Sequence, residues 1–67
     1  MTRKPRRIGR LLALPRTDGA EIMIDPAVIA SISPHRRDRG VTVIQILGDL
    51  GNKIFVALDY EELVSLL

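Results

Sequence analysis

Residues 41–58 decide the fold, and they read VTVIQILGDLGNKIFVAL. Two runs rich in β-branched and large apolar residues, 41–47 and 53–58, flank a polar segment that contains two glycines. Short runs of this kind on either side of a glycine-containing turn are typical of antiparallel strands. In the second run Ile54, Val56 and Leu58 alternate with their neighbours and share one face. The stretch therefore predicts two strands that turn an apolar face toward a core.

The first of these runs, residues 41–47, is apolar on both faces. Val41, Val43 and Gln45 fall on one face of the expected strand. Ile44 and Ile46 fall on the other face. A strand with two mostly apolar faces has to be covered on both sides. The second cover is hard to provide in so short a chain, and a second copy of the chain is one way to provide it.

Three further runs precede this hairpin. They cover residues 11–14, 21–24 and 28–33. The segments between the runs carry turn residues: Thr17-Asp18-Gly19, Asp25-Pro26 and the arginine-rich segment 36–40. The sequence therefore predicts a curved antiparallel meander of five strands.

Residues 59–67 predict a helix. Asp59 stands where an N-cap residue belongs, and Glu62 three positions later completes the carboxylate version of a capping box. A helix this short is unstable alone, so it must dock on the sheet or on a partner's sheet. The expected fold class is mainly β, a small α+β protein in which a five-stranded meander is closed by one short C-terminal helix. The apolar stripe expected to dock consists of Tyr60, Leu63, Val64 and Leu67.

The composition excludes several classes of function. The chain has 67 residues, no cysteine and one histidine, which leaves no disulfide framework, thiolate zinc site or multi-histidine metal site. Aromatic residues make up 3% of the chain, too few for the aromatic platforms on which many single-stranded nucleic-acid binders stack bases. A chain of this length forms one domain with a marginal core. We therefore expect a small binding module without an enzymatic activity, a metal or a cofactor.

Charge is unevenly distributed along the chain. Residues 1–16 hold six Lys and Arg and no acid (+6), whereas residues 17–67 hold four Lys and Arg and eight acids (−4). We expect residues 1–9 to form a basic flexible arm and residues 10–67 to form a single domain. Arg10 interrupts the apolar residues that follow the arm, so we expect no signal peptide. No window approaches the roughly 18 apolar residues of a membrane span, and we expect a cytoplasmic protein with no membrane contact.

Basic residues gather in the arm and in the arginine turn at residues 36–40. Arginine forks in either place can bind phosphate groups, and the same residues can instead form a solvated, disordered terminus and a solvated loop. The sequence leaves open whether the partner is nucleic acid, a nucleotide or an acidic protein. The candidate anion-binding residues are Arg3, Lys4, Arg6, Arg7, Arg10, Arg36, Arg37 and Arg39.

No set of catalytic residues can be assembled from the sequence. His35 lies beside two arginines without a carboxylate to orient it, which favours a histidine of a surface loop. Most of the aspartates stand beside Gly or Pro or at the expected helix start, where turns and caps need a short acceptor. Glu61 and Glu62 are adjacent on the expected helix, so their side chains diverge by about 100°. We therefore expect a protein without catalytic residues.

Residues 17–29 read TDGAEIMIDPAVI and are followed by Ile32. Together with residues 42–46 (TVIQI), Gly51, Val56 and residues 61–63 (EEL), they resemble the short FlbD-like proteins, small bacterial proteins associated with flagellar operons. The resemblance covers about residues 14–67, and it implies the strand-and-helix fold described above with no catalytic residues. Neither the basic residues 1–10 nor the arginine turn belongs to the family's pattern. A phage or plasmid protein of similar shape is the alternative.

These observations lead to two expectations for function. The first is a small regulatory module that self-associates and binds a larger protein partner; a further possibility is an inhibitor of a larger enzyme that docks by adding a strand at an exposed edge. The alternative is an anion-binding module for nucleic acid or a phosphorylated nucleotide, such as a sequestering protein of a mobile element. The candidate self-association residues are Val41, Val43, Gln45, Leu63, Leu66 and Leu67.

Overall fold

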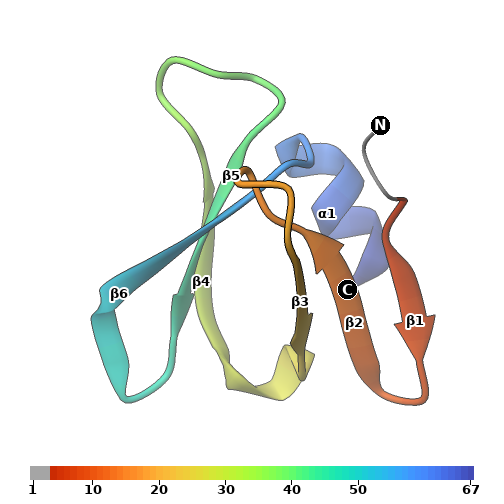
Figure 1. Cartoon of the computed structure of the whole chain (residues 1–67). Helices are drawn as coiled ribbons and strands as arrows, with labels where there is room; N and C mark the ends of the chain where they lie inside the picture. Colours follow the sequence, from red (N-terminus) through yellow and green to blue (C-terminus); the bar gives the residue numbers. More distant parts are fainter. Residues whose placement is uncertain (1–3) are drawn as a thin grey trace.

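The first half of the chain folds into a three-stranded antiparallel sheet. A computed structural model describes residues 4–67, and over this range β1 (Arg6–Ile8), β2 (Leu11–Pro15) and β3 (Glu21–Ile24) pair in sequence order (Figure 1). The strand β1 lies inside the segment that the sequence predicted to be a flexible arm, residues 1–9. Its residues Arg6 and Arg7 pair with Ala13 and Leu12 of β2. Part of the expected arm is therefore an edge strand of the sheet.

The second half forms another three-stranded antiparallel sheet. The strands β4 (Ile29–Pro34), β5 (Thr42–Ile46) and β6 (Asp49–Val56) again pair in sequence order. The register of β5 against β6 shifts between Gln45 and Ile46, which marks a bulge in the hairpin. The strands thus follow the predicted runs closely, although β6 begins inside the segment predicted to be a turn.

The two sheets separate at Asp25 and Pro26, and here the prediction of one five-stranded meander was wrong. The carboxylate Oδ1 of Asp25 accepts a hydrogen bond from the backbone N–H of Ala27 at 3.0 Å and caps the 3-10 helix η1 (Pro26–Val28). Pro26 has no N–H to donate to a neighbouring strand. The chain therefore leaves the first sheet after β3 and begins a second sheet with β4. Within residues 4–67 the protein is mainly β, with six strands in two sheets.

A short seam joins the two sheets at the ends of β2 and β6. The backbone N–H of Ala57 donates to the carbonyl of Pro15 at 2.7 Å, and that of Thr17 donates to the carbonyl of Phe55 at 3.3 Å. An isolated antiparallel bridge between Arg16 and Val56 lies between these two bonds. The seam brings the inner faces of both sheets onto one core.

The core takes residues from both sheets and from the helix. Its fully or nearly fully buried apolar members are Leu12, Leu14, Ile24, Ile44, Val56, Leu58 and Leu63. Thr42 is the buried polar residue among those described, and its hydroxyl donates to the carbonyl of Leu58 at 2.8 Å. This bond satisfies two groups that burial would otherwise leave without a partner.

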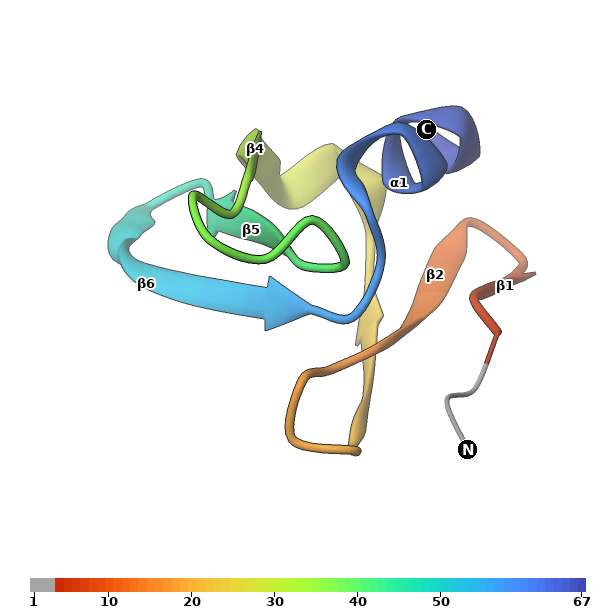
Figure 2. The same ribbon diagram turned by 90° about the horizontal axis from the view of Figure 1, so that it is seen from above.

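The C-terminal helix α1 (Tyr60–Leu66) begins as predicted. Asp59 Oδ1 accepts a hydrogen bond from the backbone N–H of Glu62 at 2.8 Å, so Asp59 is the N-cap. The helix lies between β4 and β1 (Figure 2), where the Arg7 guanidinium donates to the carbonyl of Leu66. Within residues 4–67, no helix is long and apolar enough to cross a membrane.

The expected apolar stripe of the helix docks only in part. Leu63 is fully buried in the core, and Leu66 packs against it. Tyr60, Val64 and Leu67 are exposed instead. The seven-residue helix contacts the sheets along a narrow line, so positions on either side of Leu63 remain in solvent.

Candidate anion-binding site

The outer face of the second sheet carries two rows of side chains. Residues directly opposite each other on antiparallel strands share a face, and this face is opposite the one on which Ile44 enters the core. Val43 and Gln45 in the middle strand are half-buried, and Phe55 is 38% exposed. The two rows, as the register gives them, are Ser33–Val43–Phe55 and Ser31–Gln45–Lys53.

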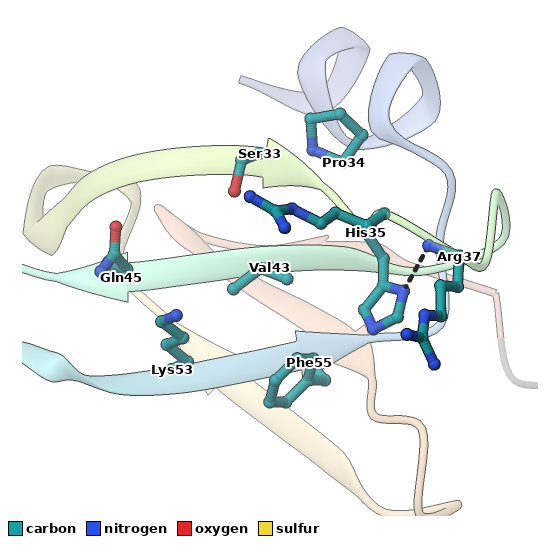
Figure 3. A pocket seen from close by; sticks show the side chains of 9 residues that line it. Ser33, Pro34, His35, Arg37, Val43, Gln45, Lys53 and Phe55 are labelled. Atoms are coloured by element: carbon teal, nitrogen blue, oxygen red, sulfur yellow. Dashed lines mark hydrogen bonds between the residues drawn. The ribbon is translucent and has the colours of Figure 1, made fainter.

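A pocket of about 520 Å³ lies on this face, and we call it the outer-face pocket. Figure 3 shows His35 and Arg37 at one end, Gln45 and Lys53 at the other end, and Val43 between them. None of the lining residues is acidic. The pocket therefore combines an apolar floor with a cationic rim. It is lined by Ser33, Pro34, His35, Arg36, Arg37, Val43, Gln45, Lys53 and Phe55.

His35 shapes the loop that carries the two arginines. Its ring nitrogen Nδ1 accepts hydrogen bonds from the backbone N–H groups of Arg37 at 3.1 Å and Asp38 at 3.2 Å. Because Nδ1 is an acceptor, the ring proton of the neutral imidazole belongs on Nε2. The ring also contacts Phe55 edge to face, with the ring centroids 6.0 Å apart and the planes at 65°. His35 thus ties the arginine turn to the sheet below it.

The cations of the pocket rim have no acidic partner. Arg36, Arg37 and Lys53 form no ion pair with any other residue in the range 4–67. Arg36 and Arg37 come from the loop after β4, whereas Lys53 comes from β6 and stands opposite Gln45 of β5. Because no ion pair within residues 4–67 neutralises them, the positive charges at the two ends of the pocket favour an anionic ligand.

The basic residues near the N-terminus are placed differently. Arg6 reaches Glu21 at 3.3 Å, and Arg10 reaches Asp25 at 3.1 Å. Lys4 is exposed without an ion pair to a described residue, and Arg3 lies outside the described residues.

The two basic regions of the sequence do not meet in the structure. In both Figure 1 and Figure 2 the strand β1 lies on the opposite side of the molecule from the loop between β4 and β5. The structure therefore separates the N-terminal candidates from the arginine turn instead of joining them on one face.

Arg39 does not line the outer-face pocket. It lines a second pocket, of about 450 Å³, together with Asp59 and Glu61 at the start of α1. This second pocket therefore has acidic as well as basic lining residues. Of the candidate residues of the arginine turn, Arg36 and Arg37 remain with the outer-face pocket.

Lys53 and Phe55 complete the pocket and were missing from the candidates drawn from the sequence. The signal was their alternation on β6, which places both on the face opposite Ile54 and Val56. That alternation becomes informative only with the register of β6 against β5, because the register sets Lys53 beside Gln45.

The candidate self-association residues do not form one surface. Leu63 is fully buried in the chain's own core, so it is not available to a second copy, and Leu66 is half-buried against that core. Leu67 is exposed at the end of the chain. The remaining candidates are half-buried in or beside β5: Val41, Val43 and Gln45.

Comparisons with protein-family models, with curated proteins and with solved structures found no match for this chain. The resemblance to the FlbD-like proteins stays a prediction from the residues quoted above. Within residues 4–67, no group of three or more His, Cys, Asp and Glu side chains is arranged to hold a metal ion.

Proposed function

We propose that this chain is a non-catalytic module that binds an anionic ligand in the outer-face pocket. The observation that carries the proposal is the set of cations Arg36, Arg37 and Lys53, which form no ion pair within residues 4–67, around a pocket with no acidic lining residue. Arginine presents a planar fork that matches the oxygens of phosphate and carboxylate groups. The His35 Nε2–H adds a neutral donor beside this fork.

The proposal predicts that binding is electrostatic and that the affinity depends on the salt concentration. Arg36, Arg37 and Lys53 are exposed, so counterions screen them, and binding weakens as the ionic strength rises. The basic residues near the N-terminus contribute less in this proposal because Arg6 and Arg10 already contact Glu21 and Asp25.

Two matched double variants test the proposal. Both R36A/R37A and R6A/R10A remove two positive charges, but only the first pair lines the pocket. Titration calorimetry with inorganic pyrophosphate at low ionic strength should show binding to the unaltered protein and to R6A/R10A. R36A/R37A should weaken binding at least about tenfold, the effect of losing roughly 1.4 kcal/mol or more.

Other results would distinguish binding in the pocket from attraction to the net positive charge of the protein. Equal loss in both variants would mean that only the net charge matters, and the pocket would not be the site. Absence of pyrophosphate binding to the unaltered protein at low ionic strength would overturn the proposal.

Self-association is a second candidate function, favoured by an exposed apolar cluster at one end of the second sheet. Leu47 and Leu50 of the β5–β6 hairpin are 59% and 56% exposed, and Val28 of η1 is 40% exposed. The backbone N–H of Leu47 donates to the carbonyl of Val28 at 2.8 Å, which holds two of these residues together. Exposed neighbouring apolar residues are typical of contact surfaces.

Light scattering at micromolar concentration tests this second candidate. We expect a mass of at least twice 7.5 kDa for the unaltered chain. L47E/L50E should return the mass to that of a monomer. The control L67E also places a charge at an exposed apolar residue, but outside this cluster, and should leave the mass unchanged. A monomer before any substitution would exclude self-association.

A further inference from the structure

The geometry points to a nucleoside phosphate as the ligand of the outer-face pocket. This inference rests on the anion-binding function proposed above and names the class of anion. It is drawn from three parts of the pocket that suit different parts of one small molecule: an apolar floor, a cationic loop and a polar far end. Hydrogen bonds hold His35 at the loop and Gln45 at the far end.

The floor offers a flat apolar surface for one planar ring. Phe55 and Val43 stand opposite each other on β6 and β5, and both line the pocket. The Phe55 carbonyl accepts a hydrogen bond from Thr17, and the Phe55 ring meets His35 edge to face. A phenyl ring that already contacts another side chain loses less conformational freedom when a nucleobase stacks on it.

The loop end suits a phosphate group. Arg36 and Arg37 carry guanidinium groups without an acidic partner in the described chain, and the His35 ring directs its Nε2–H away from the loop backbone that Nδ1 contacts. Guanidinium groups bind phosphate oxygens through two parallel hydrogen bonds. The loop thus supplies phosphate-binding donors at the end of the pocket where His35 contacts Phe55.

The far end presents polar groups of fixed orientation. The Gln45 amide donates through Nε2 to the carbonyl of Leu50 at 2.8 Å, and its Oε1 accepts from the Ser31 hydroxyl at 2.7 Å. These two bonds leave one N–H and one lone pair of the amide for a ligand. Lys53 stands directly opposite Gln45. The polar edge of a nucleobase carries donors and acceptors that such groups can meet.

The pocket fits one nucleotide better than a nucleic-acid strand. Its volume of about 520 Å³ lies within the range of small-molecule sites, roughly 300–1,000 Å³. Its aromatic rings are those of Phe55 and His35, which contact each other edge to face, whereas proteins that bind single strands stack successive bases on several separate aromatic side chains. Arg6 of β1 and Arg10 of the turn after it are paired with acids, and β1 lies on the other side of the molecule, so within residues 4–67 these two arginines do not extend the cationic surface of the pocket.

Calorimetric titration of the full chain tests the inference with adenosine monophosphate, adenosine, inorganic phosphate and a single-stranded oligonucleotide. Adenosine monophosphate should bind between about 5-fold and 150-fold more tightly than inorganic phosphate, since stacking of one base on an aromatic ring contributes roughly 1–3 kcal/mol. F55L keeps an apolar side chain but removes the ring face, and it should reduce this ratio to about 2-fold or less. The ratio compares two affinities of the same variant, so a change that F55L transmits to the arginine turn through His35 affects both ligands alike and cancels in the ratio.

The possible failures are distinguishable. If adenosine monophosphate and phosphate bind equally and F55L changes neither, the nucleotide inference is wrong and the anion-binding function stands. If no phosphorylated probe binds at low ionic strength, the proposed function fails as well. If the oligonucleotide binds far more tightly than the mononucleotide, the ligand is a nucleic-acid strand and the inference is overturned. Thermal unfolding of F55L, equal to that of the unaltered chain, would show that the variant is folded.

Discussion

The imidazole Nδ1 of His35 accepts a hydrogen bond from the backbone N–H of Arg37, two residues later, at 3.1 Å. The side chain thus plays the part that an aspartate or asparagine plays in many turns, with a ring nitrogen as the acceptor. The same ring rests against Phe55. One histidine therefore connects the backbone of the arginine turn to the floor of the outer-face pocket.

Replacing His35 with alanine should loosen the arginine turn. H35A removes the acceptor for the N–H groups of Arg37 and Asp38, so their hydrogen exchange should become faster, and pyrophosphate binding should weaken about 3-fold to 10-fold. H35N offers an oxygen acceptor near the position of Nδ1 and should restore most of the protection at Arg37. Exchange measured by NMR checks both variants. Unchanged protection in H35A would show that the turn does not depend on this ring.

The buried hydroxyl of Thr42 should matter for stability. T42V keeps the shape of the side chain but leaves the carbonyl of Leu58 without its donor, which should lower the free energy of unfolding by about 1–3 kcal/mol. The same exchange at exposed Thr17 should change it by less than about 0.5 kcal/mol. Urea denaturation measures both values. Equal effects at the two sites would mean that the bond to Leu58 contributes nothing.

Truncation should locate the true start of the folded domain. Deleting residues 2–8 removes β1 and uncovers Leu12 and Ala13, which are fully buried, so the free energy of unfolding should fall by about 2–4 kcal/mol. Deleting residues 2–5 leaves β1 intact and should cost less than about 0.5 kcal/mol. Thermal and urea unfolding compare the two proteins. Equal stability of both would place residues 6–8 outside the folded domain.

Two glycines of the β5–β6 hairpin should respond in opposite ways to alanine. Gly48 has a φ of 82°, a conformation that costs a residue with a side chain about 1–2 kcal/mol, so G48A should be destabilised by that amount. Gly51 lacks a positive φ, and a Cβ there would meet open space. G51A should therefore be unchanged or more stable by up to about 1 kcal/mol. Denaturant midpoints distinguish the two, and a stable G48A would contradict the turn geometry.

Features set by neighbouring residues could be predicted from the sequence. The strand at residues 21–24 was predicted with the bounds that the structure has, because its alternation and its flanking turn residues are local. The N-cap Asp59 was predicted correctly for the same reason, since a cap depends on a residue three positions away.

Features set by pairing between distant segments could not be predicted in this way. The strand β1 consists of Arg6, Arg7 and Ile8, which show no apolar alternation, and it exists because the neighbouring strand β2 offers free backbone groups. The separation into two sheets depends on where the chain goes after Pro26, which no local pattern contains.

The candidate site shows the same division. Arg36 and Arg37 were visible as a cluster because they are adjacent in the sequence. Their partnership with Lys53 depends on the fold that brings β6 to the loop, and the weakening of Arg10 as a candidate depends on its contact with Asp25. The sequence could therefore indicate which types of residue form the site, but the strand register was needed to show which residues lie together in it.

The seam between Pro15 and Ala57 has a consequence for how the chain folds. Within each sheet, strands pair with the strand that precedes or follows them, so their hydrogen bonds join segments close in sequence. The bond from Ala57 to Pro15 instead closes a loop of about 40 residues, with an entropic cost of roughly 3 kcal/mol. Hairpins can form quickly and separately, whereas closing this loop is the long-range step that slows folding. The folding rate should therefore be governed by the seam, and the two sheets should acquire their shared core only when it closes.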